Sequence, residues 1–428
     1  MLYAALAAFI IFFIVTLKNP LLSLAGLAAL LPSYLLRFEV FGLPSTILEA
    51  IIWAIIFSWL IFHRDFSLLK KRLPAIAWPL GLFLAASIIS VFITPEFIKS
   101  LGLWRAYFLE SILMFLLVLA IVKDKKDFEK IIIGLSVAAL FLSAFAIGQK
   151  FFSLPIPAPW QTQLRATSIF PYPNALGLFL APTVILMLGQ LVKNLSEKKK
   201  NILRIAYWAL GIILSIASVI FAESDGAVIA IFASGAIFLF LYMITNKKLR
   251  SAGIAAFVII AIAAIILFSS VAPLKNKVLL RDWSGFVRLT IWQESWNMLK
   301  DNPILGAGLG GYQAKILPYH ESRNWMEVYL FPHNFIFNFW SELGILGLAA
   351  FIWLLERFGR LCYKLLVSER QLKIFVITAI CALSAIIIHG LVDVPYFKND
   401  LSILFWIVYA MPIVVIPDRA IENIRESN

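Results

Sequence analysis

The residues with the clearest chemical potential are two histidines that stand next to apolar stretches. His333 follows Pro332 directly, with Asn334 beside it, at the start of one such stretch. His389 and Asp393 lie together at the end of a later one. Near neutral pH an imidazole can accept the proton of a hydroxyl group. The pattern indicates base chemistry at the edge of an apolar bundle, although a capping or interfacial histidine is an equally good interpretation of His333.

Arginines form the second group of candidates. Arg281 and Arg288 precede His333 in one polar segment, and Arg165 precedes Asn174 in an earlier one. A guanidinium group matches phosphate oxygens through two parallel hydrogen bonds. The arginines therefore favour an anionic ligand at the membrane surface, while Arg165 also fits the role of an interfacial anchor.

The spacing of large apolar residues predicts the helix that must position Arg288. Leu289, Trp292 and Trp296 recur at helical intervals, and Pro303 ends the pattern. We expect a helix near 285–301 that lies on the membrane surface, with its tryptophans at the depth of the lipid headgroups.

Spacing disfavours two other chemistries. The glycine-rich stretch 306–311 lacks the Lys-Ser/Thr pair of a nucleotide loop, so we interpret it as a close-packed turn. His320 joins His333 and His389 as a third candidate metal ligand, but no HxxxH or carboxylate spacing on one helix supports a metal site. We therefore expect neither a metal nor another cofactor.

The composition is that of a membrane protein. The chain of 428 residues is 62% hydrophobic and only 14% charged, whereas soluble domains are about 45–50% apolar and about 25% charged. The net charge of +13 comes from Lys and Arg between apolar stretches, which is a topology signal and predicts no nucleic-acid partner. Cys362 and Cys381 form no metal or disulfide pattern. We predict an all-α polytopic membrane protein in the lipid bilayer.

Apolar stretches long enough to cross a hydrocarbon core of about 30 Å recur along the whole chain. Only Lys18, Asn19 and Pro20 separate the first two, so we expect about 12–13 transmembrane helices in a single membrane domain over 1–428. The first stretch lacks a basic leader and is expected to stay as a span. We place the spans near 2–17, 20–36, 44–62, 75–93, 103–122, 131–149, 173–192, 202–221, 226–244, 252–271, 334–355, 374–392 and 401–417.

Charge predicts the orientation of these helices. Alternate loops are rich in Lys and Arg, while the loops between them are nearly free of both. Because basic loops face the cytoplasm, we expect the C-terminus inside, and the loop 150–172 and the large segment 272–332 outside. The basic loops are 63–74, 123–130, 193–201, 246–250 and 357–373.

Taken together, these residues resemble the O-antigen ligase and O-antigen polymerase superfamily of bacterial envelope glycan enzymes. The resemblance covers about residues 160–410 and is carried by the order and spacing of motifs that are individually unspecific. The motifs are Arg165 to Phe170 with Pro173-Asn174, Arg288 with Trp292, Pro303-Ile-Leu-Gly306-Ala-Gly308, His333-Asn334, Glu342-Leu-Gly344-Ile-Leu-Gly347 and His389-Gly-Leu-Val-Asp393.

The resemblance implies a glycosyltransferase of the bacterial inner membrane with its active site on the periplasmic or extracellular side. Its donor would be a glycan on undecaprenyl diphosphate, and its acceptor a hydroxyl of lipid A–core, another glycan or a protein. It implies catalytic roles for His333 and Arg288 in an inverting, metal-independent transfer. The implied substrate-binding residues are Arg165, Arg281, Asn334, Asn174, Trp292, His389 and Asp393.

One position departs from the family pattern. Many relatives have Ser-Arg-Gly where this chain has Asp225 in a Ser-Asp-Gly sequence, and that arginine is implicated in binding the donor diphosphate. An aspartate cannot replace it, so donor binding would depend on Arg165 and Arg288, with help from Arg281.

Other functions stay open at this point. The motifs do not separate a ligase from a polymerase, and relatives that glycosylate proteins share them. A lipid or solute transporter would use ionisable residues inside the membrane, for which Glu49, Arg105 and Glu110 are candidates, but no paired repeat supports it. A non-catalytic scaffold would explain Asp225 but not the Arg–Trp and His-Asn motifs.

Overall fold

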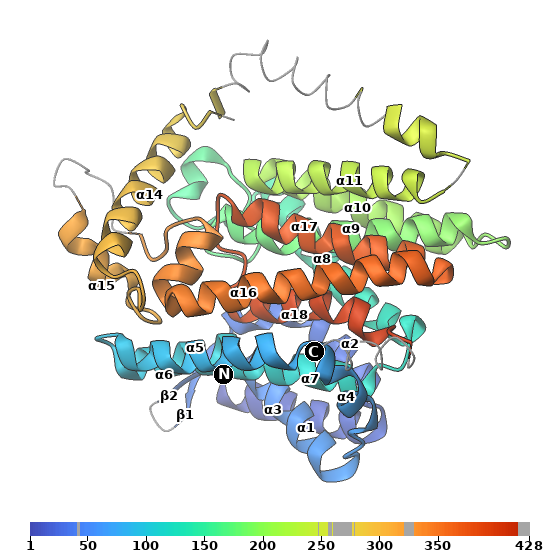
Figure 1. Ribbon diagram of the computed structural model, residues 1–428, viewed down its shortest axis with the longest axis horizontal. Helices are drawn as coiled ribbons and strands as arrows, with labels where there is room; N and C mark the ends of the chain where they lie inside the picture. Colours follow the sequence, from blue (N-terminus) through green and yellow to red (C-terminus); the bar gives the residue numbers. More distant parts are fainter. Residues whose placement is uncertain are drawn as a thin grey trace.

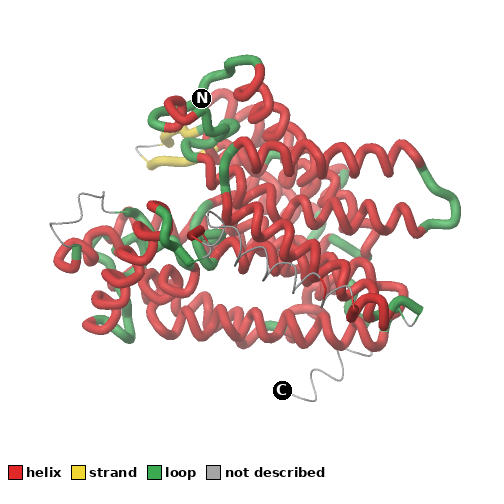
Figure 2. The backbone as a smooth tube through the Cα atoms, turned by 90° about the horizontal axis from the view of Figure 1, so that it is seen from above, coloured by secondary structure: helices red, strands yellow, loops and turns green. Residues whose placement is uncertain are grey.

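The chain is built almost entirely of helices that run roughly side by side (Figures 1 and 2). The computed structural model describes residues 1–40, 43–246, 248–255, 259, 276–277, 279–320 and 329–417. The elements are α1 (Leu2–Lys18), α2 (Pro20–Ala29), η1 (Leu31–Leu35), β1 (Arg37–Val40), β2 (Leu43–Thr46), α3 (Ile47–Phe62), α4 (Ser67–Arg72), η2 (Leu73–Ala75), α5 (Ala77–Ile93), α6 (Phe97–Trp104), η3 (Arg105–Leu109), α7 (Glu110–Ile121), α8 (Lys125–Phe151), η4 (Trp160–Gln163), α9 (Pro173–Ser196), α10 (Ile202–Phe221), α11 (Asp225–Ile244), α14 (Trp283–Asp301), α15 (Tyr312–Ile316), η5 (Leu317–Tyr319), α16 (Phe335–Ser368), η6 (Arg370–Leu372), α17 (Lys373–Gly390) and α18 (Asn399–Val414).

These helices confirm the all-α, polytopic membrane class. Among the described residues, seven helices are long and apolar enough to cross a membrane, and the bent pair formed by α3 with the helix that follows it would make eight. Four further apolar helices are shorter: α1, α2, α5 and α18. The expected span 252–271 lies mostly outside the described residues, so the total of 12–13 stays a prediction.

Some predicted boundaries were wrong. The second expected span, 20–36, ends as an α-helix at Ala29 and continues as the 3₁₀ segment η1. Pro32 in that segment has no amide hydrogen to donate to a continuing α-helix. Between the expected spans 20–36 and 44–62, β1 pairs with β2 in an antiparallel hairpin in which Arg37 lies opposite Thr46.

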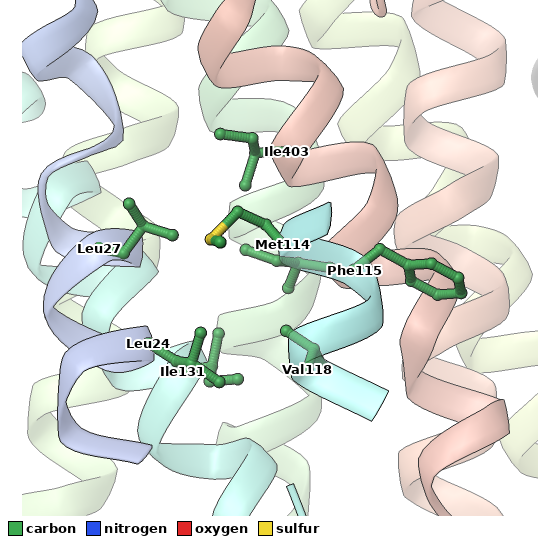
Figure 3. A pocket seen from close by; sticks show the side chains of 8 residues that line it. Leu24, Leu27, Met114, Phe115, Val118, Ile131 and Ile403 are labelled. Atoms are coloured by element: carbon green, nitrogen blue, oxygen red, sulfur yellow. The ribbon is translucent and has the colours of Figure 1, made fainter. Parts of the chain in front are cut away.

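The core is centred on α18. Every side chain from Asp400 to Val414 is buried, and the helix packs against α7, α16 and α17. The packing of α2, α7, α8 and α18 leaves a space of only about 10 Å³, lined wholly by apolar side chains such as Leu24 and Met114 (Figure 3). A space of this size holds at most one water, and it offers water no polar partner. These described helices therefore pack together as an apolar core.

The helix predicted near 285–301 is confirmed as α14, at one end of the bundle (Figure 1). The Asp282 side chain caps it by accepting a 3.0 Å hydrogen bond from the amide of Gly285. The Trp296 ring lies 6.0 Å from that of Trp340, and α14 packs against α16 and α15. The contacts of α14 are thus with protein, and its position relative to headgroups stays a prediction.

The glycine motifs form a close-packed turn, as predicted. The long helix α16 is broken at Gly344 (φ +71°), and the turn after α14 enters the break: the amide of Ile345 donates to the carbonyl of Ile304 at 3.0 Å. A Cβ on Gly344 would lie 2.3 Å from that carbonyl oxygen. Glu342 then accepts from the amide of Gly310 at 2.5 Å. These motifs fix α14 onto α16 and so position the residues that α14 carries.

Candidate active site

Five segments meet at the end of the bundle where α14 lies. They are the start of α9, the turn between α10 and α11, α14, the start of α16, and the loop after α17 (Figure 1). Each segment is fixed by a spanning helix or by α14, so the polar side chains that meet there are held by the apolar core. Most residues predicted for the site lie in these five segments.

His333 and Asp393 form the centre of the site. Nδ1 of His333 lies 3.3 Å from Oδ1 of Asp393. The other oxygen of Asp393, Oδ2, accepts a 2.9 Å hydrogen bond from Nδ2 of Asn174, and the amide of Val394 donates to Oδ1 at 2.8 Å. The carboxylate is buried, with 6% of its side chain exposed, whereas 31% of the His333 side chain is exposed. The imidazole can therefore be reached from outside while its partner cannot.

The environment of Asp393 keeps its carboxyl group ionised. Burial alone would raise its pKa, but the hydrogen bond and charge of His333, the charge of His389 and the amide of Val394 together hold the pKa of Asp393 below its usual value. An ionised Asp393 accepts the Nδ1 proton of His333. This tautomer leaves Nε2 of His333 with its lone pair available, as a general base requires.

The backbone at His333 has an unusual conformation, and neighbouring side chains hold it through hydrogen bonds. His333 has φ +48°, a region that costs energy for residues other than glycine and is often found at functional sites. Nε1 of Trp292 donates to the carbonyl of Pro332 at 3.0 Å. Asn334, not His333, caps α16: its Oδ1 accepts from two backbone amides, and its Nδ2 donates to the carbonyl of Leu391 at 2.9 Å. Trp292 and Asn334 thus position His333, and their predicted contact with substrate stays a prediction.

Arg288 reaches the same loop from α14. Its Nε donates to the carbonyl of Val392, next to Asp393, at 3.0 Å, and its Nη1 donates to the hydroxyl of Ser284 one turn earlier. Among the residues that the structure describes, Nη2 has no hydrogen-bond partner. The guanidinium group is therefore anchored beside the His333–Asp393 pair and keeps a donor for an anion.

Arg165 lies in the loop before α9 and contacts the turn between α10 and α11. Its Nε and Nη2 each donate to the carbonyl of Ala222 at 3.1 Å, and its guanidinium carbon lies 5.0 Å from the centre of the Trp160 ring. On the same turn, both oxygens of Asp225 lie 2.8 Å from Nζ of Lys277. Asp225, which departs from the family pattern, thus brings a lysine to this turn.

Two predicted site residues differ from this picture. His389 is buried, with 2% exposed. A Cβ on Gly226 would lie 2.9 Å from its ring, so His389 packs closely against the start of α11. Arg281 is exposed, and its side chain has no hydrogen bond or ion pair to another described residue. Contact of either residue with a substrate stays a prediction. No group of three or more metal-ligating side chains occurs within the described part of the chain.

Comparisons with known proteins bear on the same region. A family model described as O-antigen ligase matches residues 210–352. A Rickettsia conorii protein named "Putative polysaccharide ligase" is 30% identical over 158 residues, which amount to 35% of this chain and 37% of that protein. The match therefore spans little more than a third of the relative's length. The O-antigen ligase resemblance is confirmed.

The region that matches the family model, 210–352, contains only part of the site. Arg288 and His333 lie within it, whereas Asn174 and Asp393, which complete the polar centre, lie before and after it. The packing of helices inside and outside the matched region thus brings these four residues together.

Sequence reasoning missed two residues of this site. Ser284 stands four residues before Arg288, so helical spacing could have identified it as a neighbour. Lys277 could not be identified in this way, because its ion pair joins segments 52 residues apart.

Proposed function

We propose that this chain transfers a glycan from an undecaprenyl-diphosphate carrier to an acceptor hydroxyl at the outer face of the bacterial inner membrane. The observation that carries the proposal is the partly exposed His333, paired with a buried carboxylate and placed beside the anchored Arg288. The O-antigen ligase match supports a glycan-transferring enzyme in general terms. The arginines support a diphosphate-linked carrier, and the distribution of charge among the loops supports the outer face of the membrane.

The geometry suits a single displacement. Nε2 of His333 removes the proton of the acceptor hydroxyl, whose oxygen attacks the anomeric carbon of the donor. The bond between that carbon and the diphosphate oxygen breaks, and the diphosphate leaves with its electron pair. Arg288 neutralises the charge that develops on the leaving group, an effect that is often the largest in enzyme catalysis. One displacement inverts the anomeric configuration. No step uses a metal.

The diphosphate requires more than one cation. Arg165 is bound to the α10–α11 turn from the loop before α9, and Arg281 precedes α14. We propose that both complete the positive surroundings of the donor. Lys277 is an additional candidate, since its ion pair with Asp225 places an ammonium group where relatives have arginine.

Asp393→Asn is expected to lower the turnover number of glycan transfer by at least about 100-fold. An amide has the same shape as the carboxylate, but it no longer provides the negative charge that holds Nδ1–H and stabilises the imidazolium formed during the reaction. The turnover number and KM should be measured on the purified chain. Asp282→Asn is the matched control, because asparagine also caps helices well. Equal activity in both variants would contradict the role of Asp393.

The proposal is tested by giving the purified protein an undecaprenyl-diphosphate glycan, first alone and then with separate acceptors. Growth of a glycan ladder without an added acceptor identifies a polymerase. Transfer only to lipid A–core or to a protein identifies a ligase or a protein O-oligosaccharyltransferase. If no reaction consumed the donor, the proposed function would be overturned.

A transporter remains the alternative from another class, because the structure joins its three candidate residues. Nη2 of Arg105 lies 2.6 Å from Glu49, and its Nε lies 3.5 Å from Glu110. Glu110 also accepts a 2.9 Å hydrogen bond from Trp53. The network holds one guanidinium and two carboxylates, and Oε2 of Glu110 is buried without a hydrogen-bond partner among the described residues. Buried ionisable groups of this kind are what a transporter would use. Movement of the lipid-linked glycan across a vesicle membrane without glycan transfer would support transport instead.

A further inference from the structure

A cavity with charged lining residues lies at the end of the bundle opposite the candidate active site. It has a volume of about 320 Å³ and lies between α8, α9, α11 and the start of α17. Lys373 lines it at the first residue of α17, whereas His389 approaches the candidate active site at the other end of that helix. The 18 residues of α17 span about 27 Å at 1.5 Å per residue. The cavity is therefore separate from the site described above.

Most of the charged side chains that line this cavity are positive. Lys125, Lys193, Arg370 and Lys373 line it together with one carboxylate, that of Glu129. Glu129 is already paired with Lys193. Nζ of Lys125 lies 3.2 Å from the carbonyl of Gln371, which brings the start of α8 against the start of α17.

The start of α17 is electrostatically unusual. A helix N-terminus carries a partial positive charge and is stabilised by acidic residues. The start of α8 follows this rule, since Asp124 caps it and Asp127 lies in its first turn. The first turn of α17 has neither an acidic residue nor a side-chain cap, and Arg370 and Lys373 add two cations there.

The contacts within the protein do not fully balance these charges. Lys373 donates to the carbonyl of Thr245, which carries no formal charge. Among the described residues that line this cavity, Glu129 is the one carboxylate, and both Glu129 and the nearby Glu197 pair with Lys193. An anion in this cavity would balance the two cations and accept hydrogen bonds from the first turn of α17.

We propose that this cavity binds a negatively charged phosphate group. Its position between apolar helices, at the end where charge predicts the cytoplasmic side, favours the headgroup of an anionic phospholipid; free phosphate has the same chemistry. Basic pockets between spanning helices on the cytoplasmic side are suited to such headgroups. The proposal is independent of glycan transfer, because its test measures binding alone.

The test uses the full-length chain in detergent micelles and measures thermal unfolding together with native mass spectrometry. The probes are dioctanoyl-phosphatidylglycerol, dioctanoyl-phosphatidylcholine and inorganic phosphate. Stabilisation by phosphatidylglycerol alone supports a lipid headgroup site, and stabilisation by inorganic phosphate at similar concentration supports a free phosphate site. Equal effects of the two lipids, with none from phosphate, would overturn the proposal.

Variants locate the binding. Arg370→Gln/Lys373→Gln is expected to weaken binding of the stabilising probe by about tenfold or more. Lys199→Gln/Lys200→Gln removes the same charge from an exposed loop outside the cavity and should bind as the unmodified chain does. If the double variant does not fold, Arg370→Gln alone, at an exposed position, replaces it in the binding test. An equal loss in both double variants would show a general charge effect and reject the site.

Discussion

Replacing His333 with alanine is expected to lower the turnover number of glycan transfer by at least about 100-fold, while the chain still inserts and folds. The imidazole is held by Asp393 at 3.3 Å and is accessible from outside, so its loss removes the proposed base for the acceptor hydroxyl. The measurement is the rate of glycan transfer by the purified variant, together with its thermal stability.

The backbone at His333 calls for a second variant. Because φ at this position is +48°, alanine adds strain that asparagine tolerates better. His333→Asn therefore removes the imidazole with less disturbance of the backbone, and we expect it to be as inactive as His333→Ala. His320→Ala is the matched control, since His320 pairs with Glu294 in the same polar segment and has no proposed role. Retained transfer in His333→Asn would remove His333 from the mechanism.

The sequence predicted the helices well, because their signals are local. The interval of Trp292 and Trp296 and the stop at Pro303 predicted a helix near 285–301, and α14 spans Trp283–Asp301. Length and apolarity likewise identified the spanning helices. The second expected span failed at Ala29, where a 3₁₀ segment follows and apolarity alone gives no sign of the change.

The sequence identified the residues of the candidate site better than their partners. The motifs included His333, Asn174 and Asp393, but not the contacts by which Asp393 joins the other two. Such contacts depend on how three helices are rotated and shifted against one another, and apolar spans constrain this weakly. Similarly, His389 carries the right chemistry, yet its burial beneath Gly226 is a property of the packing between α11 and α17.

Asp225 illustrates the same limit for charge. From the sequence, an acidic residue in place of a family arginine predicts that positive charge for the diphosphate is missing here, and that Arg165 must supply it. In the structure Asp225 forms an ion pair with Lys277, and Arg165 is bound to backbone carbonyls of the same turn. Lys277 thus offsets the negative charge of Asp225, while Arg165 also lies 3.9 Å from Glu223 of this turn. Arg288 is bound to the carbonyl next to Asp393 and so lies beside the His333–Asp393 pair.

Arg288→Lys is accordingly expected to lower the turnover number by about 100-fold with a smaller change in thermal stability. Arginine uses Nε for the carbonyl of Val392 and Nη1 for Ser284, and still has Nη2 to offer an anion. Lysine has a single ammonium group at the end of a flexible chain, so it cannot hold the anchor and the diphosphate in the same fixed geometry.

The control for Arg288→Lys is Arg37→Lys, the same exchange at an exposed position in β1. It should transfer glycan at the rate of the unmodified chain. Ser284→Ala adds an intermediate case, because it leaves Arg288 charged but removes one of its anchors; we expect a loss several times smaller than that of Arg288→Lys. Full activity of Arg288→Lys would show that position 288 needs only a positive charge. The diphosphate clamp would then have to be sought at Arg165 and Lys277.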